Sequence, residues 1–377
     1  MEGLTSFCPL VDYVADITAP CTFVLVDIGV GRGIDRQWRR FGRRLRAIGF
    51  DPSVKEIERL IAAEKNPNVK YVNAFASLPQ DHPFVQKTRL SPFGTRNPWP
   101  RLSACRYLEQ VYPATQQICD QERLAANLWP TAELAPSEKS IVVPEFLRQS
   151  GIDNVDFLKI DVDGKDFEIL NSFDDVLADF GILSIGIEVN FFGSDCETAN
   201  TFHNVDRYLK ARGFEIFHLT TRHYSTAALP SKFLYREPGP TEFGRVLQGD
   251  AMYARDLASG LYNDLAATLS GDQILNLAAI FASFNLPDCA AETVQTFRSK
   301  LSPLCDVDSV LDLLAAQASN TVLGGGDYRK HVTRFAEEPR SLLRTRNKLV
   351  RIGQIIKKAY LERRARRQLC RLEGSRR

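Results

Sequence analysis

Glycines follow an acidic residue where an apolar run near the N-terminus gives way to a helical pattern. The run starts at Thr22, and the segment from Asp27 to Gly33 reads DIGVGRG. Glycines at such a turn allow backbone conformations that other residues avoid, and they let a ligand approach the main chain. The following helix N-terminus offers free N–H groups. The segment predicts an adenosine-cofactor site with contacts from Asp27, Gly29, Gly31 and Gly33.

Two classes of cofactor use a turn of this kind. The dinucleotide fingerprint GxGxxG needs a third glycine where this sequence has Ile34, so an NAD-dependent oxidoreductase is the least favoured reading. The carboxylate of Asp27 would repel a pyrophosphate but suits the cationic ammonium group of S-adenosylmethionine. Asp51 ends the next predicted strand and can accept both ribose hydroxyls. Asn73 and Ala74, at the end of the third predicted strand, complete the predicted cofactor contacts.

A second group of acids follows two later predicted strands. Asp161 and Asp163 come directly after the strand 155–160, and Glu188 ends the strand 183–189. Carboxylates at this edge of a sheet can hold a hydroxyl nucleophile, orient the ammonium group or bind a divalent ion. We expect Asp161 to be catalytic and to contact the cofactor, with Glu188 as the second catalytic candidate. No metal site is assigned; if a metal binds, these two residues are its predicted ligands.

Other polar residues near these strands receive less specific interpretations. Asp163 and Asp166 read as a solvated rim with helix-capping aspartates, and Lys159 reads as packed or paired with a carboxylate. His203 lies in a predicted helix, where histidines are usually structural. His223 is expected on a loop after the sixth strand and is the third catalytic candidate.

Strand-like and helix-like segments alternate through the first 255 residues, which predicts a parallel sheet covered by helices on both faces. Residues 79–136 interrupt this alternation with a proline-rich insertion, interpreted as a lid or substrate segment or else as a disordered loop.

Beyond residue 255 the pattern is helical. The predicted divisions are a domain at 1–255, a small helical domain at 256–323, and a glycine hinge with a basic helical tail at 324–377. The predicted strands are 22–28, 45–50, 68–74, 155–160, 183–189, 214–219 and 248–255, and the predicted helices are 34–45, 53–63, 144–149, 165–173, 197–212, 256–269, 272–284, 289–301 and 306–318.

The segment from Leu158 to Gly164, LKIDVDG, resembles the signature of FkbM-type S-adenosylmethionine-dependent methyltransferases. The glycine turn, Asp51 and the strand ending at Glu188 match that family in the same order, over about residues 22–219. The resemblance implies an α/β class I methyltransferase fold, a Rossmann-like, mostly parallel seven-stranded sheet, with a C-terminal α-helical region outside the family pattern. It also implies methylation of oxygen. Aspartate stands at 163 where the family usually has glutamate, which bears on the substrate rather than the cofactor.

The net charge of +2 conceals an uneven distribution along the chain. Residues 340–377 contain 14 Lys and Arg and two acidic residues, so the first 339 residues carry a net charge of −10. The tail combines basic residues with an apolar stripe, which is consistent with association with an anionic membrane through residues 340–370, with nucleic acid binding, or with a solvated or oligomerising helix. Eight scattered cysteines without a CxxC pair, and no basic start to the chain, predict a cytoplasmic protein, peripheral at the inner face of the membrane if the tail binds there.

These observations lead to one favoured function and two alternatives. We expect an S-adenosylmethionine-dependent O-methyltransferase of the polysaccharide-biosynthesis type, acting on a sugar hydroxyl of a glycan or glycolipid precursor. The preference for a glycan comes from the family resemblance and the tail. The alternatives are a methyltransferase that acts on nucleic acid through the tail and a catalytically silent binding protein with the same fold. Oligomeric state and metal dependence are left open by the sequence.

Overall fold

The computed structural model divides the chain into two compact units, residues 1–310 and residues 311–377. It describes residues 8–17, 22–79, 81–90, 139–162, 164–192, 196–224, 233–234, 237–238, 244–319 and 327–337. The predicted insertion beyond residue 90, up to 136, lies outside the described residues. Asp163 and the basic tail from residue 338 also lie outside them.

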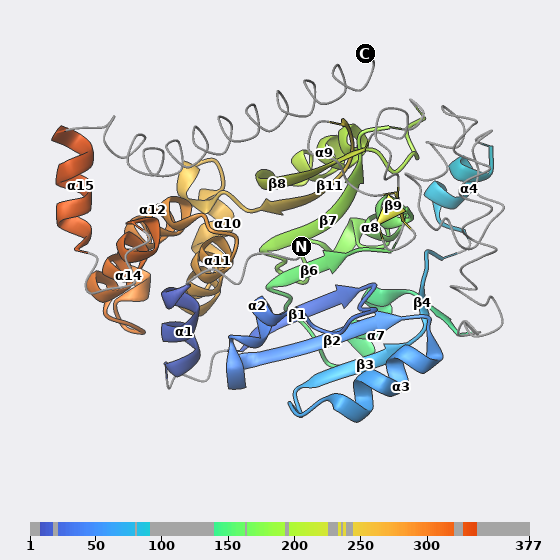
Figure 1. Cartoon of the computed structure of the whole chain (residues 1–377), viewed down its shortest axis with the longest axis horizontal. Helices are drawn as coiled ribbons and strands as arrows, with labels where there is room; N and C mark the ends of the chain where they lie inside the picture. Colours follow the sequence, from blue (N-terminus) through green and yellow to red (C-terminus); the bar gives the residue numbers. More distant parts are fainter. Residues whose placement is uncertain are drawn as a thin grey trace, which may run out of the picture. The chain divides into compact units, whose positions relative to one another are not determined.

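A seven-stranded sheet forms the centre of the first unit (Figure 1). Its order is β3-β2-β1-β6-β7-β11-β8, and each strand is parallel to its neighbour except β11, which runs antiparallel to both β7 and β8. This is the sheet of the class I methyltransferase fold that the sequence predicts. The strands are β1 (Phe23–Ile28), β2 (Leu45–Asp51), β3 (Val69–Asn73), β6 (Phe157–Ile160), β7 (Ser184–Asn190), β8 (Glu215–Tyr224) and β11 (Arg245–Ala254).

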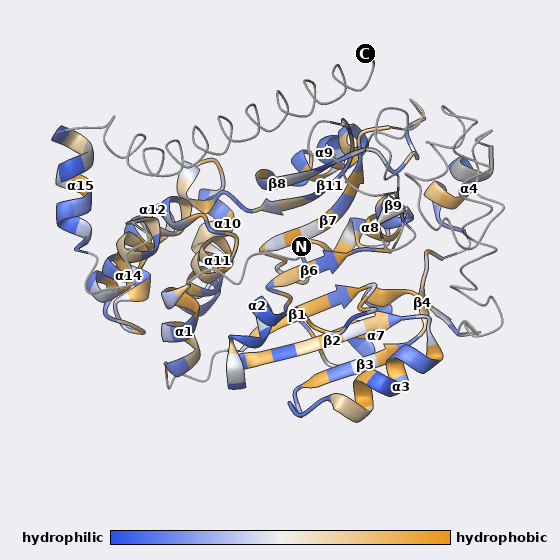
Figure 2. Cartoon of the chain, viewed as in Figure 1, coloured by the Kyte–Doolittle hydropathy of each residue, from blue (hydrophilic) through white to orange (hydrophobic). Residues whose placement is uncertain are grey.

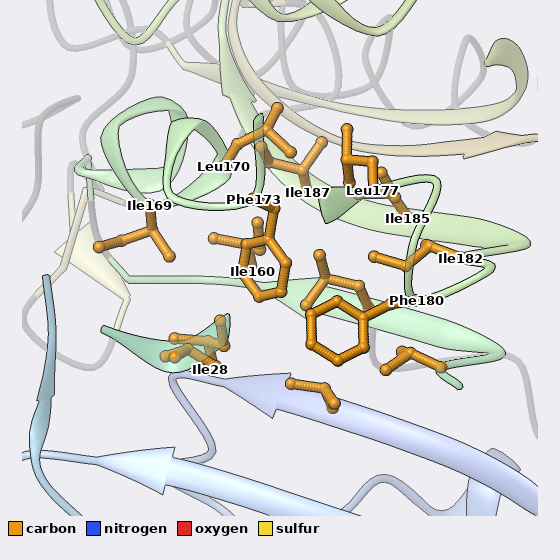
Figure 3. Close-up of a cluster of buried hydrophobic side chains, with 14 of the residues drawn as sticks. Ile28, Ile160, Ile169, Leu170, Phe173, Leu177, Phe180, Ile182, Ile185 and Ile187 are labelled. Carbon is orange, nitrogen blue, oxygen red and sulfur yellow. The ribbon is translucent and has the colours of Figure 1, made fainter. Parts of the chain in front are cut away.

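One face of the sheet packs against three helices through a continuous apolar core. Alternate residues of each strand point to this face, since side chains alternate along a strand. Ile28, Ile160 and Ile187 are at most 2% exposed and pack with Ile169 and Leu170 of the helix that follows β6 (Figure 3). The covering helices are α7 (Val143–Gln149), α8 (Asp166–Asn171) and α9 (Phe202–Lys210).

The opposite face is apolar only at the amino-terminal half of the strands. There Phe23 stacks on Phe41 with 3.9 Å between ring centroids, and Trp38 lies 4.4 Å from Phe157. Phe284 joins the same aromatic cluster. Figure 2 shows β1 as hydrophobic over most of its length and hydrophilic near its arrowhead. The carboxyl half of this face is therefore left for polar chemistry.

Two helices after the first two strands show how local sequence sets the elements. The predicted helix 34–45 is shorter in the structure. Only α2 (Arg36–Arg39) is helical, and a 3-10 turn, η1 (Gly42–Arg44), follows it and begins at Gly42 with a φ of 58°. The predicted helix 53–63 is confirmed as α3 (Val54–Ala63), and the hydroxyl of its cap Ser53 accepts a hydrogen bond from the Glu56 N–H. The remaining elements of the first unit are α1 (Pro9–Asp16), β4 (Phe75–Ala76), α4 (Pro83–Leu90), β5 (Ser140–Ile141), η2 (Asp174–Val176), β9 (Phe233–Leu234), β10 (Glu237–Pro238), η3 (Leu257–Ser259), α10 (Asn263–Thr268), α11 (Gly271–Ser283), α12 (Pro287–Thr296) and α13 (Arg298–Leu301).

The C-terminal helices up to residue 310 belong to the same compact unit as the sheet, so the predicted division at residue 255 does not hold. The reason is α11, in which all ten residues from Ile274 to Ser283 are buried. The ring centroids of Phe281 in α11 and Phe217 in β8 lie 4.6 Å apart. The helices α14 (Val307–Ser319) and α15 (Tyr328–Glu337) follow, and no helix in the described ranges is long and apolar enough to cross a membrane.

A buried carboxylate fastens α11 to the start of the sheet. Asp156 accepts the Val24 N–H at 2.7 Å and the amide Nδ2 of Asn276 at 3.0 Å. The same Nδ2 also donates to the Thr22 carbonyl oxygen at 3.0 Å. Asp156 is fully buried, and this burial raises its pKa to about 6 against the opposing hydrogen bond from Val24.

The raised pKa of Asp156 predicts a stability that depends on pH. Between about pH 4 and pH 6 the folded chain holds a proton on Asp156 that the unfolded chain has released, so the free energy of unfolding falls as the pH rises through this window. We expect the wild type to lose about 2 kcal/mol relative to Asp156→Asn between pH 4.5 and 6.5. Urea unfolding of both proteins measures this difference, and parallel pH curves would contradict the assignment.

Candidate functional site

The glycine turn after β1 lies between the ends of two neighbouring strands. The N–H groups of Gly29 and Val30 both donate to the Phe50 carbonyl oxygen, at 2.9 and 3.1 Å. Gly29 has a φ of 93°, and a Cβ placed on it would lie 1.8 Å from the Asp161 carbonyl oxygen. Only glycine fits there. The turn after β1 and the turn after β6 are thus in backbone contact, as an edge-of-sheet ligand site requires.

Asp51 lies against the same turn from the other side. An added Cβ on Gly31 would lie 3.4 Å from the Asp51 Oδ2, while Oδ1 accepts the Ser53 N–H at 2.8 Å. The Asp51 carbonyl oxygen accepts hydrogen bonds from the Asn73 Nδ2 and the Ala74 N–H, at 3.1 and 3.2 Å. Burial raises the pKa of Asp51. The structure brings Asp51, Asn73 and Ala74 together beside the glycines, and their contact with a cofactor stays a prediction.

Asp27 corrects one prediction from the sequence. Its side chain is 0% exposed, and the Lys159 Nζ lies 3.2 Å from its Oδ1. Burial raises the pKa of Asp27 to about 6 although the lysine charge opposes this. Asp27 is therefore not placed to meet the ammonium of a cofactor, because Lys159 compensates its charge inside the protein.

Lys159 links Asp27 to the predicted catalytic aspartate. Its Nζ also lies 3.6 Å from an Asp161 carboxylate oxygen, and the Asp161 side chain is 43% exposed. Burial lowers the pKa of Lys159, but the charges of Asp27 and Asp161 raise it more, and the net direction is upward. A permanent positive charge thus lies between one buried and one accessible carboxylate.

Glu188 is held by a similar bridge on three adjacent strands. It forms an ion pair with Arg222 of β8, and Arg222 also lies 3.7 Å from Asp250 of β11. Glu188 and Asp250 are register partners, so their side chains share a face of the sheet. The Glu188 carboxylate is 8% exposed, which makes Asp161 the more accessible proton acceptor of the two.

The two bridges border one crevice on the carboxyl half of this face. Gly186 is the register partner of Lys159 and contributes no side chain between them. The six charged side chains of the two bridges are four carboxylates and two cations, which makes this surface acidic. The crevice is too narrow to admit a water molecule, and it is lined by Lys159, Ile160, Asp161, Gly186, Ile187, Glu188 and Asp250.

The structure places His223 away from this crevice. The residue lies within β8 rather than on the predicted loop, and adjacent Arg222 points to the opposite face. Its Nδ1 lies 3.1 Å from the Gly244 carbonyl oxygen and its Nε2 3.0 Å from the Thr221 hydroxyl. Because a carbonyl can only accept, Nδ1 carries the proton. His203, in α9, is exposed.

The burial of Asp166 was not predicted from the sequence. The predicted solvated aspartate is 0% exposed, and its carboxylate accepts the N–H groups of Val162 and Gly164, each at 2.9 Å. The Asn200 Nδ2 donates a third hydrogen bond at 3.0 Å. Burial raises the pKa of Asp166 to about 7. An acidic residue two positions after Gly164 was the available signal, but its burial depends on the distant Asn200.

The strand order is that of the class I methyltransferase fold. Residues 116–216 match the family model of the methyltransferase FkbM domain. The matched segment includes β6, Asp161, Asp166 and Glu188. The chain is thus a methyltransferase whose class uses S-adenosylmethionine as the methyl donor.

Comparisons with whole proteins and solved structures add little to this assignment. No curated protein matches the sequence. A TehB-like S-adenosylmethionine-dependent methyltransferase from Corynebacterium glutamicum is 11% identical, covering 65% of this chain and 87% of its own, with a TM-score of 0.26. A precorrin-6y C5,15-methyltransferase from Geobacter metallireducens is 11% identical, covering 68% and 91%, with a TM-score of 0.28. A putative methyltransferase solved with the Haloferax volcanii Trm112 activator is 9% identical, covering 64% and 85%, with a TM-score of 0.30.

The residues at the carboxyl edge fit the donor of this class. Gly31 leaves space that a Cβ would fill, and Asp51 lies beside it with a carboxylate suited to two hydroxyl groups. Asp161 supplies an accessible negative charge next to the turn. For metals, the described ranges contain no group of three or more His, Cys, Asp or Glu side chains that could hold an ion.

The buried Asp27–Lys159 pair predicts a clear pattern in a double-mutant cycle. Lys159→Met leaves Asp27 buried without its counter-charge, and we expect a loss of about 3–5 kcal/mol in the free energy of unfolding. Replacing both residues, as Asp27→Asn with Lys159→Met, should recover most of this loss. Urea unfolding at pH 7.5 measures all four proteins, and additive losses would show that the pair does not interact.

Proposed function

We propose that the protein transfers a methyl group from S-adenosylmethionine to a hydroxyl of a sugar in a glycan or glycolipid precursor. The observation that carries the proposal is the accessible Asp161 carboxylate beside the glycine turn, at the carboxyl edge of the sheet. The FkbM domain match supports methyl transfer, and the resemblance to that family favours oxygen as the acceptor atom. A role in polysaccharide biosynthesis is part of this proposal.

The charge of the crevice favours a neutral hydroxyl acceptor over nucleic acid. Both cations are already bridged, Lys159 by Asp27 and Asp161, and Arg222 by Glu188 and Asp250. The two bridges contain four carboxylates and two cations, and this excess of negative charge disfavours a phosphate backbone. Sugar hydroxyls donate hydrogen bonds that carboxylates accept.

The residues of the chain would act by holding, orienting and accepting a proton. The donor supplies a methyl group on a positively charged sulfur when it is bound. The glycine turn and Asp51 hold its adenosine part. Asp161 would accept the hydrogen bond of the acceptor hydroxyl and would take up its proton. Glu188, which Arg222 fixes, would accept a hydrogen bond from a second hydroxyl of the acceptor sugar and so orient the sugar. Such alignment can contribute roughly 7–11 kcal/mol to lowering the barrier.

Ligand binding and labelling together test the proposal. S-adenosylhomocysteine, and not NAD, should stabilise the protein in a thermal-shift assay. Tritium from the donor methyl group should then appear in neutral sugars, oligosaccharides or glycolipids and not in total RNA. Labelled RNA would favour the nucleic-acid alternative. Binding of S-adenosylhomocysteine with no acceptor labelled in any class would favour a silent binding protein.

The role of Asp161 gives a specific expectation. Asp161→Asn keeps the size of the side chain but removes the proton acceptor, so methyl transfer should fall by roughly 10²- to 10⁴-fold. Affinity for S-adenosylhomocysteine, measured by calorimetry, should stay within about threefold of the wild type. Asp250→Asn, in the second bridge, is the matched control and should have a much smaller effect. Unchanged turnover in Asp161→Asn would remove Asp161 from the mechanism.

We also propose that residues 340–370 bring the enzyme to an anionic membrane, as a peripheral and not a spanning protein, on the cytoplasmic side. Basic residues near anionic lipid contribute about 1 kcal/mol each, and this segment is the most basic of the chain. The full chain should co-sediment with vesicles containing phosphatidylglycerol but not with pure phosphatidylcholine vesicles. A chain truncated at residue 339 should not sediment with either. Co-sedimentation that depends on neither the lipid nor the tail would exclude this proposal.

A further inference from the structure

The carboxylate of Asp166 bonds backward to a turn rather than forward to its own helix. Asp166 is the first residue of α8, but the cap position of that helix is Lys165, which makes no side-chain capping bond. Two of its three hydrogen bonds come from the amides of Val162 and Gly164, in the turn that follows Asp161. A residue that served only to cap the helix would accept N–H groups of the first helical turn instead.

The turn that Asp166 holds is fixed from both sides. On one side, the Asp161 N–H donates to the Ile28 carbonyl oxygen at 2.9 Å, and the Asp161 carbonyl oxygen lies against Gly29. On the other side are the two amides bonded to Asp166. Gly164 has a φ of 99°, so the turn adopts a conformation that costs little only for glycine. Any outward movement of the turn breaks bonds to Asp166, and any inward movement meets Gly29.

The third hydrogen bond extends this support to the end of β7. Asn200 donates to Asp166 through Nδ2, and its Oδ1 accepts the Phe167 N–H at 3.2 Å. The Asn200 carbonyl oxygen accepts the Asn190 Nδ2 at 3.1 Å, and Asn190 is the last residue of the strand that carries Glu188. One buried carboxylate therefore joins the two strand ends that present Asp161 and Glu188.

We propose that Asp166 is a positioning residue for methyl transfer, which fixes the backbone of the Asp161 turn against the donor-binding glycine turn and ties it through Asn200 to the end of β7. The inference rests on the proposed function, since it assumes that a donor binds at the glycine turn. Asp166 itself, being fully buried, touches neither donor nor acceptor. Its effect passes through the position of the Asp161 backbone.

The test compares Asp166→Asn with Asp156→Asn, a matched control. Both aspartates are fully buried and both accept a backbone N–H and an asparagine amide, but Asp156 lies at the opposite edge of the sheet. We expect Asp166→Asn to weaken S-adenosylhomocysteine binding at least tenfold in calorimetry. It should also speed hydrogen exchange of the Val162 and Gly164 amides at least tenfold. Asp156→Asn should change both by less than twofold, even where its melting temperature falls as much.

Each result decides the inference. Binding and exchange in Asp166→Asn within twofold of the wild type, or equal changes in both variants, would overturn it. If Asp166→Asn does not fold, Asn200→Ala removes the hydrogen bond to Asp166 and the one from the Phe167 N–H, and it should shift both measurements in the same direction by about two- to fivefold; no shift would overturn the inference. If the wild type does not bind S-adenosylhomocysteine, the proposed function fails, while amide exchange still decides whether Asp166 holds the turn.

Discussion

The arrangement of the site depends on one buried ammonium group. The Nζ of Lys159 lies between the carboxylates of Asp27 and Asp161, and without them its burial would cost far more than the fold could offset. The pair with Asp27 lies within the sheet, whereas the contact with Asp161 reaches the accessible edge. The requirement to compensate one charge therefore connects the interior of β1 and β6 to the surface where ligands bind.

The sheet supplies the geometry that this compensation needs. Asp27, Lys159 and Gly186 are register partners across three parallel strands, so they lie in one row on one face. The amino half of that face is filled by an aromatic cluster and α11, which leaves only the carboxyl half to polar groups. Parallel strands end at a common edge, and the turns after β1 and β6 meet there in backbone contact.

The sequence predicted local features well and long-range ones poorly. Strand periodicity and glycine turns located the sheet, Asp51 and Asp161, since each depends on neighbouring residues. The burial of Asp27 and Asp166 could not be predicted, because each depends on a partner far along the chain: Lys159 for Asp27 and Asn200 for Asp166. The attachment of α11 to the sheet was missed for the same reason. It depends on a hydrogen bond from Asn276 to the Thr22 carbonyl oxygen, and these residues are 254 positions apart in the sequence. His223 was predicted on a loop because the pattern gave no sign that β8 continues to Tyr224.

The position of β11 between β7 and β8 has a consequence for how the protein is made. β8 is synthesised before β11, yet it has no place in the sheet until β11 arrives and pairs with both neighbours. A chain still emerging from the ribosome would thus carry the whole glycine turn while Arg222 has no settled position. The acidic crevice is completed only after residue 250 has been translated, and the first strand gains its bond to Asn276 later still. The carboxyl edge of the sheet therefore assembles late in biosynthesis, since its last strand pairs are non-local.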